Sequence, residues 1–436
     1  MGMNRSLSSF AYIVALGTLA DSLLSLVSLL TVSRLSTSAV AAIGLTSYLF
    51  FVINAASFIF SGGLAVVVSQ AMGAGEEEVA ERSASETVTL AFLSSLIALS
   101  SIPFWLKSYL KLVSMWNIEV VELSYQYASV RFASLPIILL SAALSAVYRG
   151  ADEAWTPTIY SILSAIAGAI LIPVLTLGFL NFPGVGLLGA GLGSVISSYI
   201  GSVAYVMRPP PLRIRVRKPG RLALRAMWVG LPMASERVIS SIAQNIYVNA
   251  VARSGTKALA AHNIGLTVES VIIQPSFAVS IAALVKAGQS VGSSDDRKLD
   301  SVIKKGAVIG ATWMGFASVV LIAVSPFVGG IFSPDPEVAR LTTIYLMLAG
   351  ASEVGLGVSQ ALLGAIRGMG SVWVPFALTS FSVVFLRALP AQALSLKYGA
   401  VGAWITQNSD MYGRVILSYI TWRILGSRKL AKKVFV

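Results

Sequence analysis

Apolar segments of 20 or more residues recur along the whole chain, and each is long enough to cross a bilayer as a helix. The segments are continuously apolar and lack the polar–apolar alternation of a barrel strand, so we expect helices. The first is too long for a cleaved signal peptide and contains Asp21. Twelve spans are predicted: 10–33, 39–71, 84–104, 121–148, 157–178, 185–207, 223–251, 258–289, 302–326, 338–366, 372–395 and 399–422.

Composition excludes several other classes of protein. Of the 436 residues 56% are hydrophobic and 12% are charged, whereas an ordinary soluble domain has about 25% charged residues. The chain has no Cys and one His, His262, so we expect no disulfide, no metal site and no cofactor. No Gly-x-x-x-x-Gly-Lys-Ser/Thr loop occurs, so the chain is predicted not to hydrolyse ATP and not to be an enzyme.

The basic residues fall unevenly between the two sides of the predicted spans. Of 32 Lys and Arg, 21 lie on the side that carries both termini, seven on the other side and four inside spans. The positive-inside rule therefore predicts a multi-pass plasma-membrane protein with both termini in the cytoplasm. We attribute the net charge of +13 to this topology and to contact with anionic lipids. We expect no nucleic-acid partner, because no basic patch interleaved with aromatic residues occurs.

The two halves of the chain resemble each other at four points, in the same order. The matched pairs are 34–42 with 253–261, 70–73 with 289–292, 149–157 with 367–375, and 186–190 with 399–403, with offsets between 213 and 219. Each copy covers six spans, an even number, so the repeat is parallel. A parallel repeat predicts a pseudo-two-fold axis along the membrane normal and a site near the midplane between the lobes.

A basic, proline-rich segment separates the two halves. The sequence RPPPLRIRVRKPGR occupies 208–221. Its prolines interrupt helix formation and its charges suit a surface of lipid headgroups, so we interpret it as a cytoplasmic tether. The predicted architecture is an all-α membrane protein with an N-lobe at 1–207, a linker at 208–222 and a C-lobe at 223–436, each lobe being a six-helix bundle.

These motifs carry a resemblance to a known family. The chain resembles the multidrug and toxic compound extrusion (MATE) family of the multidrug/oligosaccharidyl-lipid/polysaccharide flippase superfamily. The segments similar to family motifs are Val68–Gly75, Ala260–Ile264, Gly230–Pro232, Arg149–Gly150, Arg367–Gly368 and Arg387–Pro390. The resemblance implies a V-shaped pair of six-helix lobes and export of amphipathic, often cationic compounds in exchange for H⁺ or Na⁺.

The chain departs from the family at one important place. Many prokaryotic members carry a cation site of acidic residues in spans one and five. The corresponding positions here hold Ser28, Gly168 and Ile172, none of which ionises. The usual N-lobe site is therefore absent, and if transport is driven by a cation, the coupling charge must come from another residue.

Three acids inside spans are candidates for cation coupling, because an ionisable group in a span is a functional candidate by default. They are Asp21, Glu236 and Glu353. Asp21 ranks first because it lies two turns before Ser28, on about the same helix face. A structural reading, in which each acid is hydrogen-bonded or protonated, stays open for all three.

The remaining acids in spans have other expected roles. Asp410 and Arg414 are spaced i, i+4, which favours an ion pair within one helix. Glu269 is expected to face either Arg387 or Arg131. His262 is more consistent with helix capping or packing than with proton relay.

Several neutral polar residues in the C-lobe form a second group. They either line a substrate cavity or bond between helices, and they are Asn245, Asn249, Gln274, Gln360 and Gln407. In contrast, the glycine-rich faces 189–193 and 364–368 predict close helix packing and no chemistry.

Two functions remain. The favoured one is an antiporter that exports amphipathic, cationic small molecules, with H⁺ or Na⁺ as the coupling ion, acting as a monomer among membrane lipids. The alternative is a flippase for a lipid-linked oligosaccharide, which would need several cationic residues in its cavity to hold a pyrophosphate. Only four Arg lie inside spans, which favours the antiporter.

Overall fold

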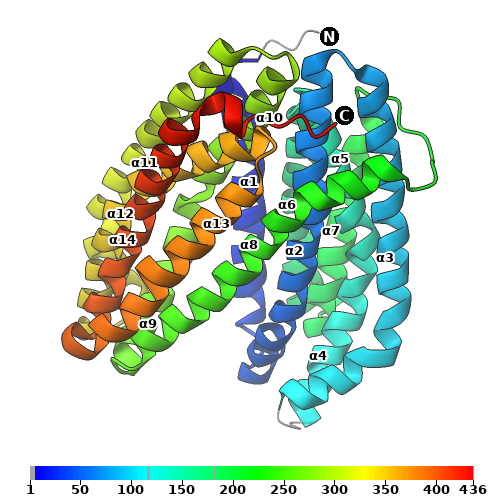
Figure 1. Ribbon diagram of the computed structural model, residues 1–436. Coiled ribbons are helices and arrows are strands. Elements are labelled where there is room, and N and C mark those ends of the chain that lie inside the picture. Colours follow the sequence, from blue (N-terminus) through cyan, green and yellow to red (C-terminus); the bar gives the residue numbers. More distant parts are fainter. Residues whose placement is uncertain (1–4, 115–117, 180–181, 436) are drawn as a thin grey trace. The chain divides into compact units, whose positions relative to one another are not determined.

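The computed structural model describes residues 5–114, 118–179 and 182–435 of the chain, and these residues are mainly helical (Figure 1). The elements are α1 (Leu7–Val32), α2 (Thr37–Ala74), α3 (Glu77–Val113), α4 (Ile118–Arg131), η1 (Phe132–Ser134), α5 (Leu135–Gly150), α6 (Trp155–Leu177), β1 (Gly178–Phe179), β2 (Phe182–Pro183), α7 (Leu187–Met207), α8 (Arg221–Ala252), α9 (Thr256–Ile272), α10 (Gln274–Gly292), α11 (Asp296–Phe332), α12 (Pro336–Gly368), α13 (Trp373–Phe381), η2 (Ser382–Ala388) and α14 (Leu389–Leu430). The strands β1 and β2 form a short antiparallel pair between α6 and α7.

The helices, singly or joined across a bend, account for the twelve predicted spans. Within the described ranges, nine helices are long and apolar enough to cross a membrane, and α9 with α10, bent by 40°, makes a tenth. The 58-residue stretch Trp373–Leu430 covers spans eleven and twelve, since its backbone leaves the helical conformation at Gly399 with φ of 61°. The remaining span is α8, which has 32 residues and several charged side chains.

Several helices extend beyond the predicted spans. The α3 helix begins at Glu77 rather than at residue 84, and α11 begins at Asp296 rather than at 302. These extra turns are charged, and acids are favourable at a helix N-terminus. Asp295 also caps α11 by accepting the backbone N–H of Lys298 at 2.9 Å. Hydropathy identifies the apolar layer, whereas capping determines where a helix begins.

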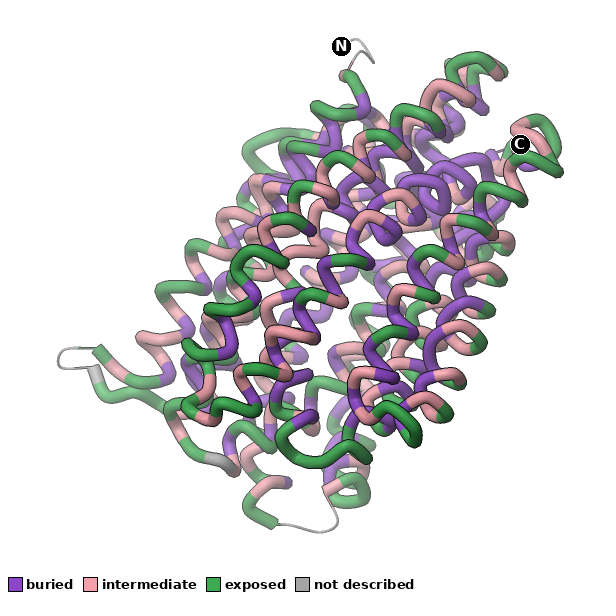
Figure 2. The backbone as a smooth tube through the Cα atoms, turned by 90° about the vertical axis from the view of Figure 1, so that its left-hand side faces the viewer, coloured by how far each residue is buried: buried purple, intermediate pink, exposed green. Residues whose placement is uncertain are grey.

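Side chains on the outer faces of the helices are largely apolar. Buried and exposed positions alternate along the helices (Figure 2). Phe104, Phe316 and Ile331 are 86%, 74% and 76% exposed. Large apolar side chains facing outward are expected where the surroundings are hydrocarbon rather than water. The structure and the hydropathy together describe a multi-pass membrane protein.

The chain packs into two compact units, the N-unit and the C-unit. The N-unit comprises 16–68 and 77–231, and the C-unit comprises 1–15, 69–76 and 232–436. In the N-unit α6 packs on α7, and α4 packs on α3 and α7. In the C-unit α12 is central, because α9, α10, α11, α13 and α14 all contact it. The predicted lobes 1–207 and 223–436 rest on the sequence repeat rather than on packing, include some residues outside the described ranges, and stay a prediction.

Close helix packing occurs where the glycine-rich faces predict it. A Cβ at Gly189 of α7 would lie 2.1 Å from the carbonyl oxygen of Leu175 on α6. A Cβ at Gly368 of α12 would lie 2.1 Å from the carbonyl oxygen of Leu284 on α10. Only glycine allows backbones to approach this closely, so the packing role of both faces is confirmed.

Candidate functional site

Buried polar side chains gather in the C-unit around the central helix α12. We call this group the C-unit cluster. It consists of Glu269 on α9, Tyr345, Ser352 and Glu353 on α12, Ser382 and Arg387 on η2, and Gln407, Asp410 and Arg414 on α14. Each of these residues is at most 9% exposed.

A π-helical segment positions Arg387 in this cluster. The segment η2 spans Ser382–Ala388 and is followed by Pro390, which has no N–H to donate to the carbonyl of Leu386. A π turn accommodates such a missing bond, and π turns are frequent at functional sites. The Arg387 guanidinium lies 4.4 Å from the ring centre of Tyr247 on α8.

A chain of hydrogen bonds joins Glu269 to Arg387 through Gln407. The Gln407 Nε2 donates to Glu269 Oε1 at 2.7 Å, and Gln407 Oε1 accepts from Arg387 Nη2 at 3.1 Å. The Gln407 Nε2 also lies 3.3 Å from Ser352 Oγ, and the Tyr345 hydroxyl donates to Glu269 Oε2. Of the two partners expected for Glu269, Arg387 is the one it meets, through the amide rather than directly.

Asp410 has a full set of partners. Its two carboxylate oxygens accept from Arg414 Nε at 2.7 Å and Arg414 Nη2 at 2.6 Å, and Ser382 Oγ donates at 2.6 Å. Arg387 Nη1 lies 4.0 Å from Asp410 Oδ2. The ion pair predicted within this helix is confirmed, and it neutralises Asp410.

Glu353 differs from the other acids of the cluster. It is 1% exposed, and neither carboxylate oxygen has a hydrogen-bond partner among the described residues. The carboxylate of Glu269 acts on it electrostatically. An ionised carboxylate without partners in such surroundings costs several kcal/mol, and a bound cation or proton removes that cost.

His262 packs between aromatic rings close to this cluster. Its ring centre lies 5.6 Å from that of Tyr247 and 5.0 Å from that of Tyr345, both with edge geometry. Neither ring nitrogen has a hydrogen-bond partner in the part of the chain that is described. The packing role expected for His262 is confirmed. It does not cap α9, which begins at Thr256.

Asp21 lies on α1 in the N-unit, next to α6. Its Oδ2 accepts a hydrogen bond from Ser161 Oγ at 3.1 Å. Arg149 at the end of α5 interacts with it electrostatically, but no ion pair joins the two among the described residues. The Asp21 side chain is therefore held by one neutral hydroxyl and lies within the field of one cation.

Glu236 is paired across helices. Arg367 Nη2 lies 2.7 Å from its Oε1 and 2.8 Å from its Oε2. The two side chains are 15% and 12% exposed. Sequence reasoning found no basic partner for Glu236 on its own helix, and the structure supplies one from α12.

The positions of the usual N-lobe acids carry no ionisable side chain in the structure. A Cβ at Gly168 would lie 2.4 Å from Leu24 Cδ1, and Ile172 is 1% exposed. Ser28 lies on the adjoining helix α1 and is half-buried. These helices are packed by side-chain contact, and no carboxylate lies at these three positions.

The predicted polar residues separate into two groups. Gln407 joins the C-unit cluster, whereas Asn245 and Asn249 are exposed on α8. Gln274 bonds to the Ser270 carbonyl at the bend between α9 and α10, where Pro275 interrupts the helix. Gln360 is half-buried on α12.

Sequence reasoning missed Tyr345, Ser352 and Ser382 as members of the cluster. A usable signal was present, since Tyr345 and Ser352 are polar residues seven apart on the helix that carries Glu353. Residues seven apart lie on about the same helix face. Ser382 gave no such signal, because its partner Asp410 is on a different predicted span.

Comparison with known proteins identifies the family of the chain. The sequence model of the MatE family matches residues 14–174 and 232–391, one match in each half of the chain. The chain belongs to the MatE family. Members of this family are membrane transporters rather than enzymes. The two separate matches fall on the two copies of the internal repeat.

Two individual relatives are described as probable multidrug resistance proteins. The chain is 25% identical over 394 residues to a probable multidrug resistance protein NorM of Thermotoga maritima, covering 88% of this chain and 84% of that protein. It is 25% identical over 438 residues to the probable multidrug resistance protein YoeA of Bacillus subtilis, covering 98% and 94%.

Two solved structures show that this MatE chain has the two-lobe, twelve-helix fold. An outward-facing multidrug resistance MATE transporter of the MOP superfamily aligns with a TM-score of 0.90 at 21% identity, over 97% of this chain and 96% of that chain. A MOP superfamily transporter from Pyrococcus furiosus, described as having a binding pocket of reverse polarity and a suggested different function, aligns with a TM-score of 0.87 at 20% identity, over 98% and 96%.

Proposed function

We propose that this MatE protein is a secondary active transporter that exports amphipathic, cationic small molecules by antiport with H⁺, or Na⁺, through alternating access. The two named relatives are described as probable multidrug resistance proteins, which supports small-molecule export. The lobes 1–207 and 223–436, joined by the linker at 208–222, would be the halves that alternate.

The charge balance of the C-unit cluster carries this proposal. The cluster holds three carboxyl groups, on Glu269, Glu353 and Asp410, and two guanidinium groups, on Arg387 and Arg414. Three carboxylates against two guanidinium groups leave one negative charge in excess. Arg414 bonds to Asp410 and Arg387 to Gln407, whereas Glu353 has no partner among the described residues. One bound cation makes the cluster neutral.

A proton suits Glu353 better than Na⁺ does. A carboxyl group binds H⁺ alone, whereas hard metal cations require several oxygen ligands. Neither Glu353 oxygen has a hydrogen-bond partner among the described residues. We therefore rank Glu353 first for coupling, and Asp21 second because Ser161 is its only hydrogen-bond partner outside its own helix in the described residues. Glu236 ranks third, because Arg367 already neutralises it.

Binding of one cation can drive exchange if a drug cation and a proton compete for the same negative charge. The occluding conformational change would then require one occupant or the other. The exposed amides Asn245 and Asn249 on α8 would contribute to the substrate cavity, together with Gln274, Gln360 and Gln407.

The flippase alternative has less support. A lipid pyrophosphate would require guanidinium groups free to form bidentate contacts. Arg414 is bidentate to Asp410, and Arg387 bonds to Gln407 and lies over Tyr247. These cations are already used within the protein.

The proposal also covers the orientation of the chain in the membrane and its oligomeric state. The excess of Lys and Arg on one side of the spans, 21 against seven, supports cytoplasmic termini. The internal repeat supplies both halves of a transporter in one chain, so we propose that it acts as a monomer in contact with membrane lipids.

The proposal is tested with purified protein in proteoliposomes. A fluorescent cationic dye and an imposed pH or Na⁺ gradient measure exchange for wild type and for Glu353→Gln, Asp21→Asn and Glu236→Gln. Glu353→Gln is expected to abolish proton-driven dye movement. The control is Glu337→Gln, an exposed acid at the start of the same helix. Wild-type rates in all three span variants would contradict the coupling assignment.

A further inference from the structure

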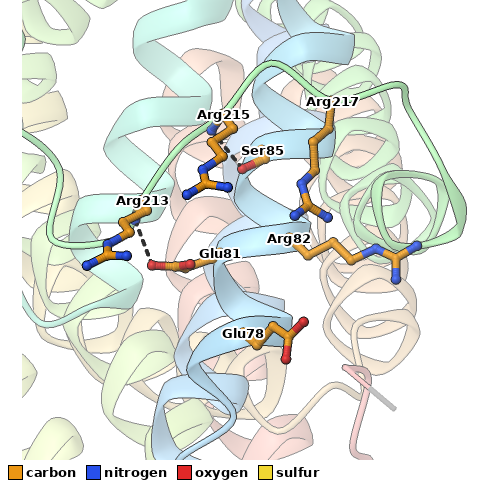
Figure 3. A pocket seen from close by; sticks show the side chains of 7 residues that line it. All are labelled: Glu78, Glu81, Arg82, Ser85, Arg213, Arg215 and Arg217. Atoms are coloured by element: carbon orange, nitrogen blue, oxygen red, sulfur yellow. Dashed lines mark hydrogen bonds between the residues drawn. The ribbon is translucent and has the colours of Figure 1, made fainter.

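The linker between the two predicted lobes lies along α3 in an extended conformation. Backbone N–H groups of Arg213, Arg215 and Arg217 donate to side chains of α3: Glu81 Oε1 at 2.9 Å, Ser85 Oγ at 3.1 Å and Thr89 Oγ1 at 3.3 Å. Figure 3 shows the first two of these bonds. Two extended residues advance about 6.6 Å, and four helical residues advance about 6 Å. This near match explains why every second linker residue meets every fourth helix residue.

The same register places three guanidinium groups around one small cavity. Because 213, 215 and 217 alternate along an extended segment, their side chains lie on one side of it. Together with Glu78, Glu81, Arg82 and Ser85 they line a cavity of about 150 Å³ (Figure 3). Leu212, which is 1% exposed, anchors the segment beside it.

The carboxylates near this cavity are mostly occupied. Glu81 accepts the Arg213 backbone N–H. Glu86 accepts from Arg82 Nε at 2.9 Å and from the Ala223 N–H at 3.3 Å. Within the described ranges none of the three linker guanidinium groups has an ion pair, and Glu78 is the nearby acid without a partner. The linker arginines are therefore cations without counter-ions.

The cavity lies where helices of the N-unit begin and end. The α7 helix ends at Met207, α8 begins at Arg221 and α3 begins at Glu77. In a spanning bundle these ends are at the level of the lipid headgroups. Guanidinium groups bind phosphate through paired hydrogen bonds, and anionic headgroups attract clusters of basic residues.

We infer that Arg213, Arg215 and Arg217, together with Arg82, form a binding site for the phosphate of an anionic phospholipid headgroup. The linker backbone is held by α3, so the site is preformed and the lipid does not have to order the segment. Glu78 opposes the bound phosphate and limits its affinity. This inference does not depend on which ion or substrate the protein transports.

The test uses full-length protein purified in a neutral detergent. Short-chain phosphatidylglycerol is titrated, and binding is measured by native mass spectrometry. Parallel titrations use phosphatidylcholine of the same chain length and glycerol phosphate. The variants are R213S/R215S/R217S, the charge-matched control R208S/K218S/R221S on the same linker, and Glu78→Gln.

We expect the affinity for phosphatidylglycerol to fall by about tenfold in R213S/R215S/R217S and by less than about twofold in the control, since only the first removes the paired hydrogen bonds. Glu78→Gln should increase affinity by about twofold, because it removes a repelling charge. Folding should persist in the triple variant, because the linker contacts to α3 use backbone N–H groups. The R213K/R215K/R217K variant, which keeps the charge, should still lose affinity.

Three results would overturn the inference. Equal losses in the two triple variants would mean diffuse attraction without a site. Equal binding of phosphatidylcholine would mean that the anionic headgroup is not selected. Binding of glycerol phosphate at the same concentration would mean that the ligand is a soluble anion rather than a lipid.

Discussion

The two halves of the chain share a repeated arginine but place their first-span acid at different positions. Each half ends a helix with Arg-Gly, at Arg149 on α5 and at Arg367 on α12. Each half also carries an acid on its first span, Asp21 or Glu236. At the repeat offset of 219, Asp21 corresponds to Ser240, which is one helical turn beyond Glu236.

This one-turn difference separates a closed ion pair from an open arrangement. Glu236 and Arg367 meet at 2.7 Å and 2.8 Å. Asp21 instead accepts from Ser161 at 3.1 Å, and no ion pair reaches it from Arg149 among the described residues. One turn moves an acid by about 6 Å along its helix, more than a hydrogen bond spans.

The difference shows that an acid on the first span of a half can be closed in an ion pair or left without one, depending on its position along the helix. In the C-half the first-span acid is neutralised, and the unbalanced charge lies instead on Glu353 of the central helix. In the N-half the first-span acid is the one left open. The carboxylate left open or unbalanced therefore lies on α1 in the N-half and on α12 in the C-half.

The largest expected effect comes from breaking the closed pair. Arg367→Ala should lower stability by about 3 kcal/mol, because it leaves a largely buried Glu236 without its partner. Arg149→Ala should change stability by less than about 1 kcal/mol, because it makes no close ion pair. Thermal unfolding of detergent-purified protein measures both. Adding Glu236→Gln should recover part of the Arg367→Ala loss, and equal losses in the two single Arg variants would break the comparison.

A second change moves the acid of the C-half to the position that the N-half uses. E236S/S240E keeps the side-chain type and shifts it by one turn. We expect a loss of about 2 kcal/mol relative to wild type, because Arg367 loses its near partner. Unfolding midpoints of E236S, S240E and the double variant form the cycle. A double variant as stable as wild type would show that the one-turn position is unimportant.

A smaller effect is expected in the N-half. Asp21→Asn should change stability by less than about 1 kcal/mol, because one neutral hydrogen bond to Ser161 is at stake and the amide can still accept it. Ser161→Ala should behave alike. The unfolding midpoint and the transport rate are measured for both variants. A stability loss matching that of Arg367→Ala would mean that Asp21 has a structural ion pair after all.

The spans were readable from the sequence because each is a continuous apolar run, and the glycine faces because close backbone approach requires glycine. Within one helix, the i, i+4 spacing was enough to predict the Asp410–Arg414 pair. Pairs between helices were not readable, because Arg367 and Glu236 are 131 residues apart. Their meeting depends on how α8 and α12 pack.

The backbone irregularities were also outside the reach of hydropathy. The bend at Ile273 and the π segment η2 each precede a proline, Pro275 and Pro390. Proline marks a disturbed helix, but whether it bends or widens depends on its neighbours. Arg387 lies within this π segment and bonds to Gln407, so the cluster could not be assembled from sequence alone.

The smallest expected effect concerns exposed ion pairs between neighbouring helices, one in each half of the chain. In the C-half Lys257 Nζ lies 3.0 Å from Asp335 Oδ2 and 2.7 Å from Glu337 Oε2, whereas in the N-half Lys107 and Glu122 are 3.9 Å apart. Lys257 and the Glu337 backbone N–H lower the pKa of Asp335 below its ordinary value of 3.8.

This lowered pKa sets the sign of a pH dependence. The contribution of Asp335 is fully present above its ordinary pKa, and it is lost as the pH falls through the lower value of the folded state. Lys257→Met should therefore lower the melting temperature at pH 7 by only about 1 °C, since exposed pairs are weak. The difference from wild type should shrink as the pH falls below 3.8 and should vanish only once Asp335 is protonated in the folded state as well. Lys107→Met, the matched change in the N-half, should show no such difference, because its pair is looser. A Lys257→Met effect that grows on acidification would contradict the assignment.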